Sequence, residues 1–189
     1  MRIAGGEWRG RNLRVPSGDA VRPTQDRVRE ALFSMLQFEL AGANVLDLFA
    51  GSGSVGLEAL SRGAAAATFV ELAPRHLACV QANIAQVKAE GRTQVVRADV
   101  YQWLASYQGV SFDIAYADPP YELGATQGYA RVLELLAVRN VVKEDGLFIA
   151  EMKAHQNPDV SPLWDLCRDR TYGQTRLAIY RRKSTDLPK

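Results

Sequence analysis

From residue 44 onward the sequence repeats one unit, in which a short apolar run is followed by a turn and then by an amphipathic segment. The apolar runs are nearly continuous, which is typical of strands that are covered on both faces in a parallel sheet. Parallel strands need long crossover connections, and the amphipathic segments can supply them as helices. The alternation therefore predicts an α/β fold with a mostly parallel sheet and helices on both sides.

Applied to the whole chain, the same patterns predict the individual elements and their limits. Strands are predicted at 44–50, 66–72, 93–99, 112–118 and 146–152, helices at 22–40, 54–63, 74–91, 100–109 and 129–142, and a last pair of strands at 164–170 and 176–183 around a turn at 172–175. Residues 1–22 are expected to form a small N-terminal β extension, 23–183 the main domain and 184–189 a frayed tail.

The composition narrows the class of protein. A chain of 189 residues, 47% of them hydrophobic, can bury a core without disulfides or structural metals. Cys79 and Cys167 lack CxxC spacing and are expected to be reduced thiols, and His76 and His155 lack metal-ligand spacing. Without a secretory segment or an apolar run of about 20 residues, the protein is expected to be cytoplasmic, free of membrane and metal, and a monomer.

A glycine-rich loop lies in the stretch VLDLFAGSGSVGLEAL, where Gly51, Gly53 and Gly56 follow a strand and open a helix. Such a loop lets a ligand approach the backbone, and the start of the helix offers N–H groups to an anion. Glu71, at the end of the next strand, can accept the hydroxyls of a ribose. Both features fit a nicotinamide dinucleotide and S-adenosylmethionine equally well.

Asp47, just before the loop, favours S-adenosylmethionine. A carboxylate would repel a pyrophosphate, whereas it could pair with the amino group of a methionine moiety. The alternative is that Asp47 binds a neighbouring backbone amide.

The fourth predicted strand ends in Asp118-Pro119-Pro120-Tyr121. Two prolines stiffen the backbone and remove two N–H donors, so the corner presents acceptors, the Asp118 carboxylate and the Pro119 carbonyl. Two acceptors that hold the hydrogens of an exocyclic amine can free its lone pair to attack a methyl group. Tyr121 can stack on the base once it has left its own stack.

These segments together resemble the class I S-adenosylmethionine-dependent amino-methyltransferases. Over nearly the full length the chain is similar to the bacterial 16S ribosomal RNA guanine-N2 methyltransferase family, through RIAGGEWRGRNL, RPTQDRVREALFSML, DLFAGSGSVGLEALSRGA and ADPPY. The resemblance implies a Rossmann-like fold with a seven-stranded, mostly parallel sheet, an antiparallel last strand pair and a small N-terminal β extension that holds RNA.

The resemblance also implies site residues. The cofactor-binding residues would be Asp47, Phe49, Ala50, Gly51, Gly53, Glu71, Leu72, Asp99, Val100 and Asp118, and the catalytic residues Asp118, Pro119, Pro120 and Tyr121. The chain departs from the family at Ala73, where a second polar residue is usual, which leaves ribose binding to Glu71. Asp99 would meet the adenine amine, and it could equally cap the helix that follows.

The N-terminal region is rich in arginine. Residues 1–30 hold seven arginines against four acidic residues and no lysine, and guanidinium groups suit forked contacts to phosphate. The predicted RNA-binding residues are Arg2, Trp8, Arg9, Arg11, Arg22 and Thr24. Alternatively, this is a solvated basic arm, Trp8 anchors it to the main domain, and Arg22 and Thr24 only open a helix.

The leading hypothesis is methyl transfer from S-adenosylmethionine to the N2 amine of a guanine in 16S ribosomal RNA, free or within a small-subunit assembly intermediate. A DNA adenine, a protein glutamine, a nicotinamide-dependent oxidoreductase and a non-catalytic RNA-binding module are the alternatives. The chain has no room for the recognition insertion of a DNA enzyme, and the glutamine enzymes usually begin the tetrapeptide with Asn.

Overall fold

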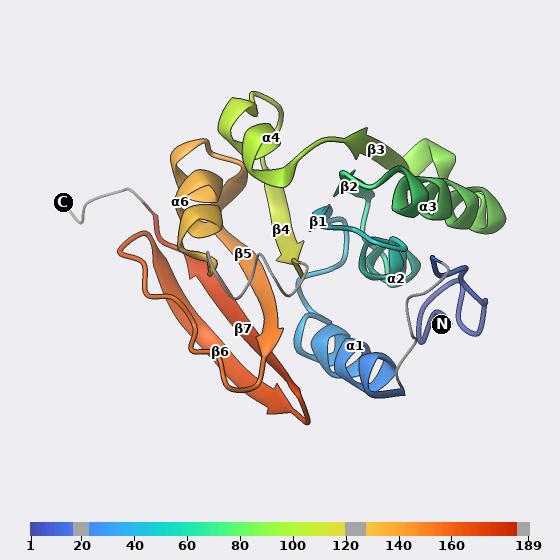
Figure 1. The fold of residues 1–189 in the computed structure, drawn as a ribbon, viewed down its shortest axis with the longest axis horizontal. Coiled ribbons are helices and arrows are strands. Elements are labelled where there is room, and N and C mark those ends of the chain that lie inside the picture. Colours follow the sequence, from blue (N-terminus) through green and yellow to red (C-terminus); the bar gives the residue numbers. More distant parts are fainter. Residues whose placement is uncertain (17–22, 120–127, 185–189) are drawn as a thin grey trace. The chain divides into compact units, whose positions relative to one another are not determined.

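Helices alternate with the first five of seven strands in this computed structural model, which describes residues 1–16, 23–119 and 128–184 (Figure 1). The chain divides into two compact units, Met1–Val100 and Tyr101–Lys189. The boundary expected at residue 22 and most of the expected tail lie outside the described residues, so the predicted domain limits stay a prediction. Across the described part of the chain, no helix combines the length and the apolar surface that a membrane crossing requires.

The first unit contains three parallel strands in the order β3-β2-β1. β1 (Asn44–Leu48) pairs with β2 (Ala66–Glu71), which pairs in turn with β3 (Thr93–Arg97). Leu48 lies opposite Val70, so the loops that follow the parallel strands leave from one edge. β1 and β2 are almost wholly buried, as expected of strands with nearly continuous apolar runs.

The helices predicted in the first unit begin within one residue of the expected start and end earlier; they are α1 (Pro23–Met35), α2 (Ser54–Ser61) and α3 (Pro74–Val87). The short 3-10 helix η1 (Glu90–Arg92) follows α3 and was not predicted. α3 was expected to reach Gly91, but Lys88 adopts a left-handed φ of 60° and its N–H bonds back to the carbonyls of Ile84 and Ala85. The prediction for α1 was also too long, since residues 36–39 form a turn.

Gly56 is needed for packing between α2 and the sheet. α2 lies against β1 and β2, and a β-carbon on Gly56 would come 2.4 Å from Cε1 of the fully buried Phe69. The third glycine of the loop therefore lets the helix approach the strand, as the loop motif requires.

The N-terminal segment of residues 1–16 forms turns joined by one antiparallel bridge between Arg2 and Asn12. Within residues 1–16, the expected β extension consists of this one bridge. The segment is held on α2 by Glu58, which is fully buried. Its carboxylate accepts hydrogen bonds from the N–H groups of Ala4 and Gly5, each at 2.8 Å, and from Nε of Arg62 at 2.7 Å.

The end of α2 also binds this segment through Ser61. The Ser61 hydroxyl accepts from the N–H of Trp8 at 2.9 Å and donates to the carbonyl of Gly5 at 2.6 Å, while its carbonyl accepts from Glu7. Gly6 passes so close that an added β-carbon would lie 1.7 Å from the Ser61 carbonyl oxygen. Only glycine allows this approach.

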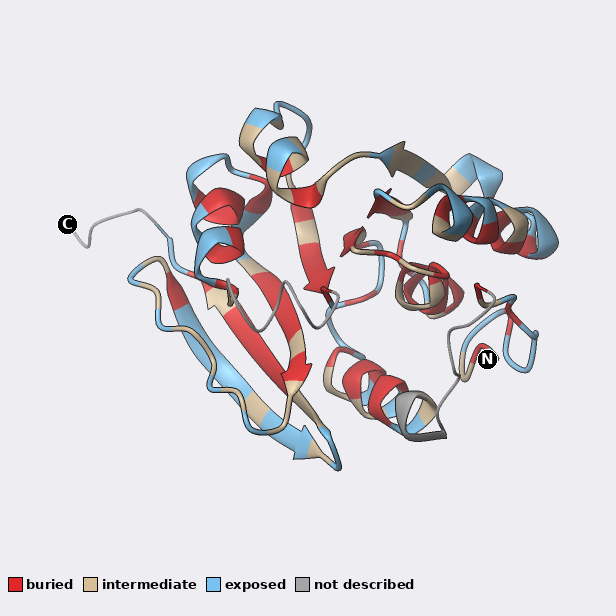
Figure 2. Ribbon diagram, in the orientation of Figure 1, coloured by how far each residue is buried: buried red, intermediate tan, exposed pale blue. Residues whose placement is uncertain are grey.

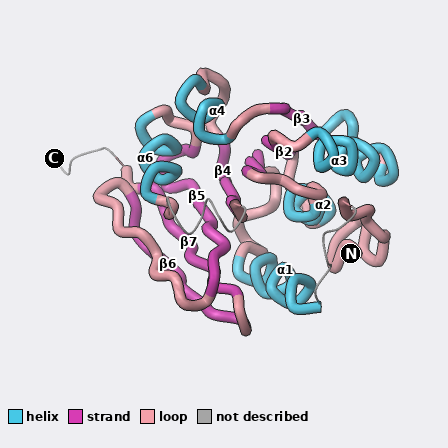
Figure 3. The backbone as a smooth tube through the Cα atoms, viewed as in Figure 1, coloured by secondary structure: helices cyan, strands magenta, loops and turns pink. Residues whose placement is uncertain are grey.

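The second unit contains four strands in the order β4-β5-β7-β6. β4 (Phe112–Ala117) and β5 (Val142–Lys153) are parallel, whereas β7 (Thr175–Arg182) is antiparallel to both β5 and β6 (Trp164–Tyr172). The helices are α4 (Val100–Ser106), whose first residue belongs to the first unit, and α6 (Ala130–Val138) (Figure 3). The predicted α/β class, with seven mostly parallel strands and an antiparallel last pair, is confirmed.

β5 starts four residues earlier than predicted. The sequence pattern places NVV in the preceding helix, but Asn140 has a φ of 52° and α6 ends at Val138. Asp145 has a φ of 61°, and the pairing with β4 shifts register there. These left-handed positions belong to residues other than glycine, so hydrophobic periodicity does not indicate them.

An aromatic cluster forms the core of the second unit. Phe148 is fully buried and has three ring neighbours with centroids about 6 Å away, Tyr129 at 5.9 Å, Tyr180 at 6.0 Å and Trp164 at 6.1 Å. The Trp164 indole donates a hydrogen bond to the Leu133 carbonyl at 2.9 Å. β4, β5 and β7 are largely buried, whereas β6 is largely exposed (Figure 2).

The approach of the N-terminal segment to α2 can be tested with two matched substitutions. Gly6 and Gly10 both have a left-handed φ, of 77° and 84°, but nothing lies within 4 Å of a β-carbon on Gly10. Gly10→Ala should therefore cost only the conformational strain of about 1 kcal/mol, whereas Gly6→Ala adds an overpacking cost of about 1–3 kcal/mol. Urea unfolding measures both, and equal losses would contradict the close approach.

Candidate active site

The glycine loop after β1 bends the backbone sharply at three positions. Phe49, Gly51 and Gly53 all have left-handed φ values, of 58°, 56° and 75°. Such a conformation is unusual for phenylalanine and is found most often where the surroundings hold it for a function. Gly53 occupies the N-cap of α2 and has no side chain to cap it, while the N–H of Gly56 in the first turn is bound by Asp47. A glycine at the N-cap leaves room for an external anion at the helix start.

Asp47 lies beneath this loop. Its side chain is 1% exposed, and Oδ2 accepts a hydrogen bond from the N–H of Gly56 at 2.9 Å. This is the second of the two roles considered for it, binding of a backbone amide. Burial raises the pKa of Asp47 to about 7, the Gly56 hydrogen bond opposes that rise, and the charge of Glu71 adds to it.

Glu71 holds the other side of the loop. One carboxylate oxygen accepts from the N–H of Gly51 at 2.9 Å and the other from the N–H of Ala73 at 2.8 Å. Nδ1 of His76 is 3.5 Å from the same carboxylate. Glu71 therefore lies at the end of β2 as predicted, and it also orders the loop.

The other predicted cofactor residues of the first unit follow β1, β2 and β3. Ala50 is buried in the loop, and Val100 is buried at the start of α4. Leu72 follows Glu71 with 56% of its surface exposed, which leaves an apolar face for a flat ring. Asp99 is half-buried in the bend between β3 and α4.

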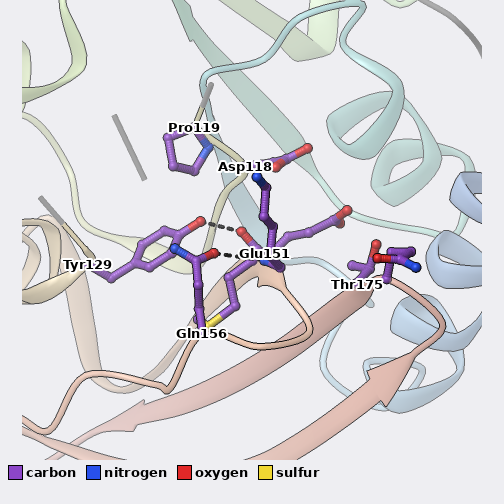
Figure 4. Close-up of a pocket in the computed structure, with 9 residues that line it drawn as sticks. Asp118, Pro119, Tyr129, Glu151, Gln156 and Thr175 are labelled. Carbon is purple, nitrogen blue, oxygen red and sulfur yellow. Dashed lines mark hydrogen bonds between the residues drawn. The ribbon is translucent and has the colours of Figure 1, made fainter. Parts of the chain in front are cut away.

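In the second unit, the corner after β4 presents Asp118 and Pro119 (Figure 4). Asp118 is exposed and Pro119 is buried, so the carboxylate is accessible while the ring that stiffens the corner is packed. Both residues line a pocket in this unit. Pro120 and Tyr121, the other half of the predicted tetrapeptide, lie outside the described residues.

Tyr129 supports this corner and was not predicted from the sequence. Its hydroxyl donates toward two backbone carbonyls, those of Glu151 on β5 and of Ala117 at the end of β4 (3.3 Å). Its ring is 3% exposed, and burial, followed by the charges of Asp118 and Glu151, raises the pKa of the phenol well above its usual value. The phenol thus stays a neutral donor that ties the end of β4 to β5. In the sequence it was only the first residue of a predicted helix.

Glu151 has a hydrogen-bond partner on β4. Oε2 accepts from the hydroxyl of Tyr116 at 2.6 Å. Tyr116 is buried, so the carboxylate is held from the interior while its residue remains partly exposed in the pocket.

The predicted RNA-binding residues fall into three groups. Arg2, Arg9 and Arg11 are exposed. Trp8 is 4% exposed and has the Arg92 guanidinium 4.9 Å from its ring centroid, which fits the alternative role considered above, an anchor for the segment. Arg22 lies outside the described residues, and Thr24 is in the first turn of α1, where its side chain is not described.

Among the described residues, no group of three or more His, Cys, Asp and Glu side chains could hold a metal ion. Cys79 and Cys167 are both free thiols, the first buried and the second exposed.

Comparison with known proteins gives consistent relatives over nearly the whole chain. A family model described as "Conserved hypothetical protein 95" matches residues 1–181. The chain is 38% identical over 185 residues to "Ribosomal RNA small subunit methyltransferase D" of Escherichia coli (strain K12), covering 97% of this chain and 91% of the relative. It is 34% identical to "Putative rRNA methyltransferase YlbH" of Bacillus subtilis (strain 168), covering 97% and 100%.

A solved structure is also similar. It is described as "Putative methyltransferase yhhF from Escherichia coli", with a TM-score of 0.85, 37% identity, and coverage of 98% of this chain and 99% of the other. The similarity confirms the fold expected from the sequence.

The protonation of Asp47 gives a testable pH dependence. Its pKa is about 7 in the folded state against an ordinary 3.8, so between pH 4 and 7 the folded chain keeps a proton that the unfolded chain releases. The free energy of unfolding should therefore fall as the pH rises through this window, by roughly 1 kcal/mol per pH unit, and level off above pH 7. Urea unfolding at pH 5, 6, 7 and 8 measures the slope.

Asp47→Asn is the comparison variant, because an amide oxygen can still accept from Gly56 but cannot ionise. We expect the free energy of unfolding of the variant to increase relative to that of the parent as the pH rises from 5 to 8. A difference in stability that is the same at every pH would show that Asp47 does not titrate there.

Proposed function

The chain belongs to the family described as conserved hypothetical protein 95 and is a relative of ribosomal RNA small subunit methyltransferase D, and from this premise we propose that it methylates the N2 amine of a guanine in 16S ribosomal RNA. The family resemblance expected from the sequence is confirmed. The observation that carries the chemistry is the exposed Asp118 carboxylate on a corner stiffened by the buried Pro119. An amine acceptor of this kind has no use in a nicotinamide-dependent oxidoreductase or a mere RNA-binding module.

The methyl donor is S-adenosylmethionine, and the residues of the first unit fit it. The start of α2, where the N-cap Gly53 carries no side chain, suits the methionine carboxylate, and the Glu71 carboxylate at the end of β2 suits the ribose hydroxyls. Leu72 offers an exposed apolar side chain to the adenine ring, and Asp99 an acceptor to its amine. When bound, S-adenosylmethionine supplies an electrophilic methyl group, whose bond to sulfur breaks as the bond to nitrogen forms.

The corner of the second unit prepares the accepting nitrogen. The N2 amine of guanine is a poor nucleophile because its lone pair is delocalised into the ring. The Asp118 carboxylate and the Pro119 carbonyl would accept its two hydrogens, which localises the lone pair on nitrogen. As the nitrogen becomes bonded to carbon it loses one proton, which Asp118 can take and pass to solvent. The contribution of the corner is positioning and electrostatics, without a covalent enzyme intermediate.

The N-terminal segment is the part of the chain best suited to hold RNA. Arg2, Arg9 and Arg11 are exposed. Glu58 and Ser61 fix the backbone of their segment to α2, so these side chains project from an ordered backbone. The substrate is ribosomal RNA, free or in a small-subunit assembly intermediate, and the protein acts as a cytoplasmic monomer. Incubation of RNA and of subunits from cells lacking the enzyme with labelled S-adenosylmethionine, followed by nucleoside analysis, tests this proposal.

Replacement of Asp118 tests the role of the corner. We expect Asp118→Ala to lower the rate of methyl transfer by at least about 10²-fold, because one of two acceptors is removed, while S-adenosylmethionine binding largely survives. Calorimetry measures the binding, and incorporation of labelled methyl groups measures the rate. Asp113→Ala is the matched control, since Asp113 lies on β4, the strand that precedes Asp118, and pairs with Lys143 on the surface. Turnover of Asp118→Ala at the parent rate would refute the mechanism.

The role of the N-terminal arginines is tested through the salt dependence of RNA binding. Replacing both Arg9 and Arg11 with Gln should weaken binding and reduce the slope of log K against log salt by about 1 for each phosphate that an arginine no longer neutralises. S-adenosylmethionine affinity should be unchanged. The control carries the same change in charge at Arg131 and Arg139, which are exposed on and after α6. Equal slopes for the parent and the Arg9/Arg11 variant would exclude the segment from the RNA site.

A further inference from the structure

The pocket in the second unit is lined by more charged and polar side chains than the proposed methyl transfer uses. Besides Asp118 and Pro119, it is lined by Glu151 and Lys153 near the end of β5 and by Thr175 at the start of β7 (Figure 4). The Asp118 corner thus shares its hollow with a second carboxylate and with an ammonium group. The amino-acid sequence alone indicates no role for either.

Glu151 and Lys153 face the same side of the sheet. Side chains two residues apart on a strand point to one face and lie about 6–7 Å apart. The burial along β5 follows this rule, because Met152 is buried whereas its two neighbours are partly exposed. In register, Lys153 lies opposite Thr175 and Glu151 opposite Leu177. An acceptor and a donor therefore stand side by side on one wall of the pocket.

The position of Glu151 is fixed by two tyrosines. The hydroxyl of Tyr116 donates to its carboxylate at 2.6 Å, and the hydroxyl of Tyr129 donates toward its backbone carbonyl. Both tyrosine rings are buried, so they hold this residue from the interior. A carboxylate oriented in this way is suited to accept a hydrogen bond from a donor at one fixed position.

The Watson–Crick edge of guanine presents three groups in a row: the N2 amine, the N1–H donor and the O6 acceptor. If Asp118 and Pro119 take both hydrogens of N2, the adjacent N1–H needs another acceptor and O6 needs a donor. Adenine has the opposite pattern on this edge, an N1 acceptor beside an N6 amine. A carboxylate and an ammonium group beside the amine-holding corner match guanine and oppose adenine.

We propose that Glu151 and Lys153 are specificity-determining residues, and that the Glu151 carboxylate accepts the N1–H of the target guanine while the Lys153 ammonium donates to its O6. This inference rests on the proposed function and deepens it by naming what selects the base. Leaving the carboxylate against an unprotonated N1 would cost its hydrogen bond and add repulsion between two acceptors.

The test compares two RNA fragments that span the methylated nucleotide and carry either guanine or 2-aminopurine there. 2-Aminopurine keeps the amine, but its N1 bears no proton and its C6 no oxygen. The measured quantity is the ratio of kcat/KM for guanine to that for 2-aminopurine. We expect Glu151→Gln to lower this ratio at least about 10-fold relative to the parent, because the amide can donate to the bare N1.

Lys153→Met gives an independent measurement. It should lower kcat/KM for guanine and leave that for 2-aminopurine unchanged, since the analogue has no O6. The matched control is Lys143→Met, which removes an exposed lysine near the start of the same strand and should leave both values at those of the parent.

The outcomes separate this inference from the proposed function. If Glu151→Gln and Lys153→Met each lower kcat/KM for guanine and for 2-aminopurine by the same factor, the two residues are structural. The inference is then overturned, while the parent still methylates guanine. A parent that methylates no guanine in ribosomal RNA overturns the proposed function, and the inference with it.

Discussion

The candidate cofactor site depends on hydrogen-bond acceptors that satisfy the backbone N–H groups of one tight turn, the glycine loop. A buried strand that turns directly into a helix, with three positions in the left-handed region, exposes N–H groups that no neighbouring carbonyl can reach. Asp47 and Glu71 supply carboxylates to two of them, at Gly56 and Gly51. Leaving such groups unsatisfied costs about 1–3 kcal/mol each, so these acidic residues shape the loop before any ligand arrives. Because Asp47 is only 1% exposed, its burial outweighs the opposing effect of the Gly56 hydrogen bond, and it holds its proton up to neutral pH.

The N-terminal segment is attached in the same way, by buried polar side chains that bind its backbone groups. Glu58 and Asn83 are both fully buried polar residues on helices, and each binds backbone groups of the segment. Asn83 accepts from the N–H of Arg14 at 2.8 Å and donates both to the Arg14 carbonyl and to the Ser52 carbonyl in the glycine loop. A single side chain thus links the arginine-rich segment to the loop. Buried polar groups with all their partners rigidify the structure around them, so the segment is an ordered part of the first unit and not a loose basic arm.

The sequence was sufficient for those features that short stretches of chain determine. Periodicity placed the strands, apart from the start of β5, together with the helix starts and the glycine loop, and the Asp118-Pro119 pair located the accessible corner. The failures have a common cause. Lys88 and Asn140 end helices in a left-handed conformation usually reserved for glycine, Trp8 is buried by a helix more than 50 residues away, and Tyr129 acts through carbonyls on two strands. Each depends on partners distant in the sequence, which local patterns do not reveal.

The two units use ionisable groups in opposite ways. In the first, the buried carboxyl of Asp47 titrates near neutrality, so its hydrogen bond to the loop changes character within the physiological pH range. In the second, the group that ties the end of β4 to β5 is the phenol of Tyr129, whose pKa burial and two nearby carboxylates push well above its usual value. A neutral phenol still donates its hydrogen bond through the pH range in which Asp47 titrates. The backbone that aims the carboxylates beside it therefore stays in place through that range, whereas the hydrogen bond from Gly56 in the glycine loop meets a change of charge.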